Sequence, residues 1–287
     1  MTDGDAPAAD DGGLDPARQR SAVRERYGEI ASAGSSCCGD GAGDCGGTED
    51  PAAEGATELG YAEEDLDAVA AGANLGLGCG NPTAIAGLEP GETVLDLGSG
   101  GGFDCFLAAR EVGDEGRVIG VDMTPEMVER ARGNVEANDA ANVEFRLGEI
   151  EHLPVADGSV DVILSNCVIN LSPDKRRVVA EAYRVLRPGG RLAVSDVVAT
   201  ADLPDDLRED PASVSACLGG AAPIPTLESM LADAGFVDVA IEPKDDSESF
   251  VREWDPDRDL SDYLTAATIE ARKPTTDPEP ATDRNAA

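Results

Sequence analysis

Three cysteines stand out in this 287-residue chain because of the residues around them. Cys79 lies in the glycine-rich run 76–80, and Cys217 precedes a Gly-Gly pair. Cys167 lies three positions after the end of the mostly apolar run 160–164, which is typical of a buried strand. Glycine lets the backbone approach a bound group closely, and thiolates select soft metals and metalloids. The three thiols therefore predict a site for a soft ion.

The other four cysteines have different surroundings. Cys37, Cys38 and Cys45 lie in a glycine-rich stretch that predicts a thiol-bearing arm. A zinc site built from them is disfavoured, because there is no C-x-x-C pair and the single histidine, His152, lies in an unrelated segment. Cys105 stands among large apolar residues in a predicted helix, so we expect a small buried hydrophobe there.

A second group of residues predicts a cofactor site. Residues 94–103 read VLDLGSGGGF, a buried strand that enters a glycine loop and then a helix. Asp122 ends the next predicted strand, where its carboxylate can accept hydrogen bonds from ribose hydroxyls. The dinucleotide fingerprint would need a glycine where Phe103 stands, and the acidic Asp96 before the loop favours a cationic ligand. The loop alone is weak evidence, since any doubly wound fold needs glycines after its first strand.

This loop resembles the S-adenosylmethionine site of class I methyltransferases. Gly148-Glu149-Ile150 stands where that family contacts the adenine, and residues 186–190 (LRPGG) match its turn before the fifth strand. The resemblance implies S-adenosylmethionine as cofactor. It places the cofactor contacts at Asp96, Gly98, Ser99, Gly100, Asp122, Met123, Glu149, Ile150 and Asn166.

Two further segments make the resemblance more specific. Residues 74–82 (NLGLGCGNP) and 165–171 (SNCVINL) resemble arsenite S-adenosylmethionine methyltransferases, with matches over about residues 18–243. The family implies arsenic(III) held by the thiolates of Cys79, Cys167 and Cys217. It also implies that a cysteine of the N-terminal pair, here Cys37 or Cys38, forms disulfides during turnover. The expected substrates are arsenite and methylarsenite, with a thioredoxin-like or small-thiol reductant.

We expect the four catalytic thiols to divide into two pairs. Cys167 and Cys217 follow strands at the ligand-binding edge of the sheet and are expected to be permanent arsenic ligands. Cys79 and Cys38 lie in glycine-rich segments outside the sheet, which suits thiols that form and break a disulfide. Two other functions remain open. One is methylation of a small metabolite such as a quinone or sterol, and the other is non-enzymatic binding of arsenic or zinc by the thiols.

The elements that must position these residues alternate between strand and helix. Apolar runs predict strands at 94–97, 118–121, 143–147, 160–164, 192–197, 237–241 and 263–271. Thr124 and Ser172, each followed by proline, are predicted N-caps of the helices that follow them, and residues 187–190 (RPGG) are predicted to end the second helix. This order predicts an α/β fold with a doubly wound, mostly parallel, Rossmann-like sheet.

Changes in composition divide the chain into five parts. We expect a disordered acidic tail over 1–16 and a disordered tail over 274–287, since neither shows apolar periodicity. Residues 17–90 are predicted to form an N-terminal helical and Gly/Cys-rich arm. The cofactor-binding core is expected over 91–200, followed by a C-terminal substrate-binding portion over 201–273 that completes the sheet.

The charge balance excludes some partners. The chain has 22 Lys plus Arg against 58 Asp plus Glu, a net charge of −36, which disfavours nucleic acid and anionic membranes. Only three basic residues are lysines, and such self-repulsion needs salt to screen it, so we interpret the chain as a halophilic protein. No apolar run long enough for a membrane span and no export signal is found, which predicts a cytoplasmic location.

Overall fold

The computed structural model describes residues 13–33, 51–244, 247, 251–252 and 258–276. Before the first strand, the described residues form four helices. They are α1 (Pro16–Ala33), α2 (Pro51–Glu58), α3 (Glu63–Ala68) and α4 (Pro82–Ala86). The predicted tails lie outside the described residues except at 13–16 and 274–276, and the segment that carries Cys37, Cys38 and Cys45 lies outside them entirely.

Strands and helices alternate along the next part of the chain, as predicted. They are β1 (Thr93–Leu97), α5 (Phe103–Val112), β2 (Arg117–Asp122), α6 (Pro125–Ala137), β3 (Val143–Leu147), β4 (Val160–Asn166), η1 (Ile169–Leu171), α7 (Lys175–Val185) and β5 (Leu186–Ala199). The C-terminal part adds α8 (Asp205–Arg208), α9 (Pro211–Ser215), β6 (Ala222–Pro223), α10 (Ile224–Ala234), β7 (Val237–Pro243), η2 (Leu260–Asp262) and β8 (Leu264–Arg272).

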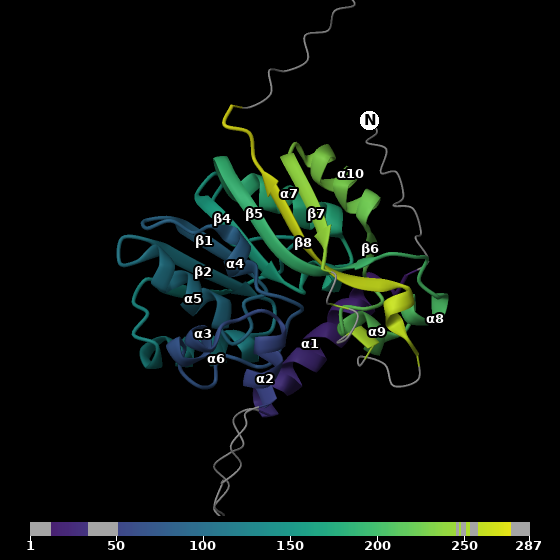
Figure 1. Ribbon diagram of the computed structural model, residues 1–287, viewed down its shortest axis with the longest axis horizontal. Coiled ribbons are helices and arrows are strands. Elements are labelled where there is room, and N and C mark those ends of the chain that lie inside the picture. Colours follow the sequence, from purple (N-terminus) through teal and green to yellow (C-terminus); the bar gives the residue numbers. More distant parts are fainter. Residues whose placement is uncertain (1–12, 34–50, 245–246, 248–250, 253–257, 277–287) are drawn as a thin grey trace, which may run out of the picture.

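The strands of the described residues form one sheet in the order β3-β2-β1-β4-β5-β8-β7, with the short β6 paired to β5. Neighbours from β3 to β5 are parallel, while β8 runs antiparallel to both β5 and β7. The chain order reverses between β1 and β4, which is where open α/β sheets bind ligands. Figure 1 shows this twisted sheet with helices on its two sides.

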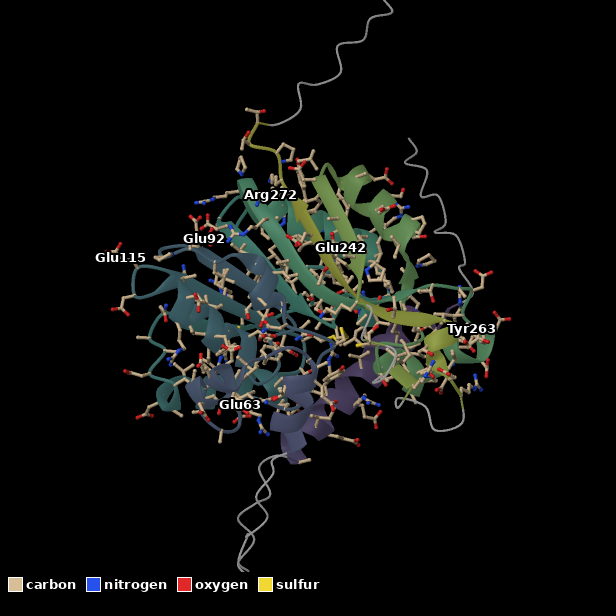
Figure 2. All side chains as sticks on the ribbon, in the orientation of Figure 1. Glu63, Glu92, Glu115, Glu242, Tyr263 and Arg272 are labelled. Carbon is tan, nitrogen blue, oxygen red and sulfur yellow. A yellow bond between two sulfur atoms is a disulfide. The ribbon has the colours of Figure 1, made fainter. Side chains whose placement is uncertain are left out.

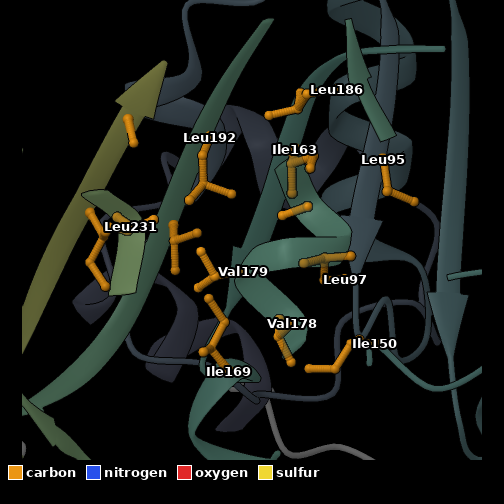
Figure 3. Close-up of a cluster of buried hydrophobic side chains, with 14 of the residues drawn as sticks. Leu95, Leu97, Ile150, Ile163, Ile169, Val178, Val179, Leu186, Leu192 and Leu231 are labelled. Carbon is orange, nitrogen blue, oxygen red and sulfur yellow. The ribbon is translucent and has the colours of Figure 1, made fainter. Parts of the chain in front are cut away.

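Two apolar layers hold the helices against the sheet. One layer joins alternate strand residues such as Leu95 and Leu97 to α7 and α10 (Figure 3). The other joins the intervening Val94 and residues of β4 to α4, α5 and α6. Side chains of a strand point alternately to the two faces, so a continuous apolar strand must be covered on both. The predicted doubly wound α/β sheet is confirmed.

Two details of the predicted helix ends are wrong. The N-cap of α7 is Asp174, whose side chain accepts a hydrogen bond from Arg177 N at 2.9 Å, and not Ser172. Ser172 instead donates its hydroxyl to the buried Glu151. The helix α7 ends at Val185, and the RPGG residues belong to β5, because Leu186 already pairs with Val160 of β4.

A third apolar cluster lies at the carboxyl edge of the sheet. It combines Val23 of α1 with residues around α8, α9 and β8, and it contains Cys79, Cys167 and Cys217. Acidic side chains cover the outside of the molecule, among them the labelled Glu63, Glu115 and Glu242 in Figure 2. No helix within the described ranges is both long and apolar enough to cross a membrane.

Candidate active site

A cleft opens at the carboxyl ends of β1, β2 and β4. Its empty volume, including the open mouth, is about 1020 Å³. The strand ends and the α1 helix line it together. All but one of the predicted cofactor contacts line this cleft, namely Asp96, Gly98, Ser99, Gly100, Asp122, Met123, Ile150 and Asn166.

The glycine loop forms one wall of the cleft. Gly98 has φ +71°, and a Cβ there would collide with the side chain of Val168. Gly100 has φ +49° and nothing within 4 Å of the position that a Cβ would take. The hydroxyl of the neighbouring Ser99 is buried and has no hydrogen-bond partner among the described residues. The open space beside the Gly100 backbone and the unpaired Ser99 hydroxyl are both suited to binding a polar ligand.

Asp122 connects this loop to the next strand. Its Oδ2 accepts a hydrogen bond from Gly100 N at 3.0 Å, and its Oδ1 accepts one from Thr124 N at 2.8 Å. Burial raises the pKa of Asp122, and these backbone donors lower it again in part. Because each carboxylate oxygen can accept a second hydrogen bond, Asp122 can still accept hydrogen bonds from ribose hydroxyls.

Two buried carboxyl groups lie close together in the cleft wall. Asp96 is 3% exposed and accepts a hydrogen bond from the Cys105 thiol at 3.2 Å. Asp104 accepts one from Tyr61 Oη at 2.6 Å. Burial raises the pKa of both groups, that of Asp104 to about 6, and the neighbouring carboxyl raises the pKa of Asp96 further. A cationic ligand in the cleft would offset both effects.

Sequence reasoning missed Asp104 and Tyr61, although both line the cleft. Asp104 could have been found, because it directly follows the glycine loop at the start of α5. Tyr61 comes from a segment between α2 and α3 that shows no such signal. Asn166 joins the two groups, since its Nδ2 lies 3.0 Å from Tyr61 Oη and 3.4 Å from Asp104 Oδ2.

Glu149 is the predicted cofactor residue that does not line the cleft. Its carboxylate forms ion pairs with Arg20 at 3.7 Å and Arg24 at 3.4 Å, both on α1. Glu151, two residues later, lines the cleft and accepts hydrogen bonds from Ser172 Oγ at 2.7 Å and from Arg20 at 3.4 Å. The α1 helix therefore holds this side of the cleft through its arginines.

One face of α1 covers the cleft. Arg20, Val23 and Tyr27 line it at helical spacings of three and four residues. The Tyr27 hydroxyl lies 4.0 Å from the Cys217 sulfur. The sequence predicted a helical arm in this part of the chain, but no local pattern indicates what the helix covers.

The three predicted arsenic-binding thiols lie together beside the cleft. Cys79 and Cys167 form a disulfide with their Cα atoms 5.8 Å apart, although 88 residues separate them in sequence. The Cys217 thiol donates a hydrogen bond to the carbonyl oxygen of Cys167 at 2.7 Å. All three residues are less than 9% exposed.

Cys79 lies in the glycine-rich segment between α3 and α4, outside the strands of the sheet. It is 1% exposed and bonded to Cys167. Its backbone N–H donates to Asn166 Oδ1 at 3.0 Å, which fixes the glycine-rich segment to the end of β4. Cys38 lies outside the described residues.

The backbone at two of the thiols is unusual. Cys167 has φ +56° and Cys217 has φ +67°, a left-handed conformation that is uncommon for residues other than glycine. Such conformations cost on the order of 1–3 kcal/mol each and persist only where the surrounding structure enforces them. Strain of this kind is concentrated at functional sites. Among the described residues other than glycine, the two cysteines share a positive φ with Asp139 and Asp238, which do not line the cleft.

A buried carboxylate accompanies the thiols. One oxygen of Asp196, on β5, lies within 4.8 Å of the sulfur atoms of Cys79 and Cys167. Burial raises the pKa of Asp196 to about 6 and also raises the pKa of the Cys217 thiol. Asp196 was not expected from the sequence, because an acidic residue within an apolar strand can equally be a structural group.

Cys105 is fully buried in α5, as expected, and burial raises the pKa of its thiol. His152 is exposed. Neither residue belongs to the group of three thiols.

The strand order with an antiparallel β8, together with a glycine loop and an acidic residue after β2, defines a class I methyltransferase. In agreement, the family model described as "Methyltransferase domain" matches residues 88–251. The predicted fold class and the use of S-adenosylmethionine as methyl donor are thereby confirmed.

Individual relatives are more specific. The chain is 60% identical over 268 residues to an arsenite methyltransferase of Halobacterium salinarum, covering 92% of this chain and 68% of that protein. An arsenite methyltransferase of Aquipseudomonas alcaligenes is 49% identical over 168 residues, covering 56% of this chain and 48% of that protein. The crystal structure of an arsenic(III) S-adenosylmethionine methyltransferase from Chlamydomonas reinhardtii matches with a TM-score of 0.59 at 35% identity, covering 80% of this chain and 75% of that one. The chain belongs to the arsenite methyltransferase family, which confirms the resemblance seen in its sequence.

Proposed function

We propose that this protein transfers methyl groups from S-adenosylmethionine to arsenic(III) held by its own thiolates. The observation that carries the proposal is the gathering of Cys79, Cys167 and Cys217 at the cofactor cleft, of which Cys167 lines the wall. Cys167 and Cys217 are proposed as permanent arsenic ligands and Cys79 as the third ligand of inorganic arsenite. Thiolates suit a soft metalloid, and their fixed positions bring it next to the bound methyl donor.

The cofactor is proposed to lie along the glycine loop. Asp122 accepts the ribose hydroxyls, and Gly98 and Gly100 let the backbone approach the methionine part. Asp96 and Asp104 provide negative charge for the sulfonium and the ammonium groups. Ser99, Met123, Ile150 and Asn166 line the same space, while the proposed adenine contact from Glu149 requires its side chain to leave Arg20 and Arg24.

S-adenosylmethionine, when bound, supplies an electrophilic methyl group. Thiolate-bound arsenic(III) keeps a lone pair and is itself the nucleophile, so the protein needs no general base. This agrees with the position of the single histidine, which is exposed and does not line the cleft. The contribution of the chain is to align two bound reactants and to exclude water.

Methyl transfer raises arsenic from the trivalent to the pentavalent state, and two electrons must return it. Two protein thiolates that join in a disulfide release two electrons, which balances this step. Cys79 and Cys38 are proposed as this pair, because Cys167 has to stay bound to the arsenic. The disulfide between Cys79 and Cys167 supports the ability of Cys79 to form such a bond when no arsenic is present. A thioredoxin-like protein or a small thiol then reduces the disulfide. We also propose a cytoplasmic, halophilic enzyme of arsenic detoxification.

Separate titrations with arsenite and with S-adenosylmethionine test this function against its two rivals. The proposed enzyme binds both. A quinone or sterol methyltransferase would bind only the cofactor, and a thiol-based arsenic or zinc binding protein would bind only the arsenical. Arsenic speciation of the products over time then shows whether methylarsenicals form, and their absence in the presence of both substrates and a reductant contradicts the proposal.

A further inference from the structure

The Cys167 backbone is held by residues beyond the thiols themselves. Its left-handed φ of +56° needs contacts that enforce it. Cys167 N donates to the Ser195 carbonyl oxygen at 2.8 Å, which continues the pairing of β4 with β5. The residues after Cys167 then leave the sheet as η1, so a second attachment is needed on that side.

Asp196 makes this second attachment. Its Oδ2 accepts a hydrogen bond from Ile169 N at 3.0 Å, two residues after Cys167. Its Oδ1 accepts bonds from Asn170 Nδ2 at 2.8 Å and from Val197 N at 2.8 Å. The carboxylate is 2% exposed, so these bonds form away from water. Asp196 therefore ties both ends of the segment 169–170 to β5.

In each of these three hydrogen bonds an N–H group donates to the Asp196 carboxylate. A carboxylate is an acceptor at both oxygens, whereas an asparagine would turn an NH₂ group toward one of these donors. The geometry therefore calls for an acidic residue at this position and not only for a polar one of the same shape. Hydrogen bonds to a charged group are also stronger than those between neutral groups.

We propose that Asp196 is a positioning residue that holds Cys167 in its left-handed conformation and thereby sets the places of all three thiols. The step from Cys167 to the others is direct. Cys79 is bonded to Cys167, and the Cys217 thiol donates to the Cys167 carbonyl oxygen. The functional importance of this positioning role rests on the proposed function, but the arrangement of the thiols can be measured without arsenic.

Asp196→Asn tests the proposal through the thiol–disulfide equilibrium of Cys79 and Cys167. In a glutathione redox buffer, without arsenic or cofactor, we expect the variant to favour the dithiol by about tenfold, the factor for losing one hydrogen bond to a charged group. Mass spectrometry of trapped peptides reads this equilibrium. Arsenite affinity of the reduced protein should fall by a similar factor, while affinity for S-adenosylmethionine stays within about twofold.

Asp161→Asn is the matched control. Asp161 is likewise a buried carboxylate that accepts a backbone N–H, from Thr93 at 2.7 Å, but it lies near the amino-terminal end of β4, away from the thiols. We expect it to lower the melting temperature and to leave the thiol equilibrium unchanged. Asn170→Ala, which removes only one donor, should shift the equilibrium in the same direction by a smaller factor and serves if Asp196→Asn does not fold.

The outcomes separate this inference from the proposed function. If the thiol–disulfide equilibrium is unchanged in Asp196→Asn, the positioning role is overturned. If arsenite binding is weaker while the equilibrium is unchanged, Asp196 is instead a direct contact of the arsenical. Equal losses of arsenite and cofactor affinity also overturn the positioning role, because they indicate general damage. If Asp196→Asn shifts the thiol–disulfide equilibrium but the wild-type protein methylates no arsenic, the positioning role stands and the proposed function is rejected.

Discussion

The Cys217 thiol donates a hydrogen bond to the Cys167 carbonyl oxygen across 2.7 Å, although the two residues are 50 positions apart in sequence. Both residues have a left-handed backbone, so the carbonyl of one and the sulfur of the other are each fixed by an unusual conformation. A shift at either residue moves the other. We therefore expect effects of substitutions at these two positions to be non-additive.

Serine substitutions should divide the thiols by substrate. With a small-thiol reductant in excess, Cys167→Ser and Cys217→Ser should lose methylation of arsenite and of methylarsenite. Cys79→Ser and Cys38→Ser should impair only arsenite methylation, because methylarsenite keeps two exchangeable bonds and needs two thiolates. Initial rates on each arsenical measure this division.

Cys105→Ser is the control for these variants. Cys105 is fully buried and outside the three-thiol group, so its loss should lower the melting temperature more than the rate. Near wild-type methylation of methylarsenite by Cys167→Ser would contradict the assignment, as would equal profiles of Cys38→Ser and Cys167→Ser on both substrates.

Reduction of the protein should be required for arsenite binding. The sulfur atoms of Cys79 and Cys167 are bonded to each other in the structure, which leaves Cys217 as the free thiol of the three. Titration before and after treatment with a thiol reductant should show arsenite binding only after it, with unchanged affinity for S-adenosylmethionine. Cys79→Ser should bind methylarsenite without that treatment, because Cys167 then lacks the thiol to which it is bonded in the structure. Equal arsenite affinity of oxidised and reduced protein would reject this prediction.

Asp122→Ala should weaken S-adenosylmethionine binding. Each hydrogen bond to a charged group contributes ~1.5–3 kcal/mol, so the loss of one raises the dissociation constant roughly 10- to 150-fold. Calorimetric titration measures it. Glu144→Gln, on the neighbouring β3 and outside the cleft, is the control and should bind as the wild type does. Unchanged affinity in folded Asp122→Ala would remove Asp122 from the cofactor site.

Salt should stabilise the folded protein. A net charge of −36 places many carboxylates close together, and ions screen their repulsion within ~3 Å at 1 M salt. We expect the melting temperature to rise from dilute buffer to molar KCl. Sorbitol at equal osmolality is the control, because it is uncharged and cannot screen the carboxylates. A melting temperature independent of KCl would speak against a halophilic protein.

Stability should also rise as the pH falls toward 5. Burial raises the pKa of Asp104 to about 6, above an unfolded value of about 3.9. The folded state therefore binds this proton more tightly, so the free energy of unfolding increases as the pH falls through 6 and levels off near 4. In molar KCl, thermal melts between pH 8 and 5 should show this increase, and Asp104→Asn should reduce it. The same slope in wild type and variant would contradict the assignment to Asp104.

Much of the fold could be predicted because its signals are local. The apolar runs of β1 to β5 predict buried strands, and the glycines after β1 together with Asp122 after β2 identify the cofactor cleft. Turn chemistry was less reliable at the start of α7. Ser172-Pro173 resembles a helix start, but the Ser172 hydroxyl is bonded to Glu151, a partner 21 residues away, which no local pattern encodes.

The sequence by itself determined the fold class, because strand and helix patterns are local and their order along the chain can be read directly. It also identified the glycine loop and the three thiols from the residues next to them. Only the tertiary structure decided which of these residues meet. It bonded Cys79 to Cys167, directed Glu149 to the arginines of α1, and brought Tyr61, Asp104 and Asp196 to the site. Such contacts join segments tens of residues apart, and they depend on how helices and loops pack over the edge of the sheet.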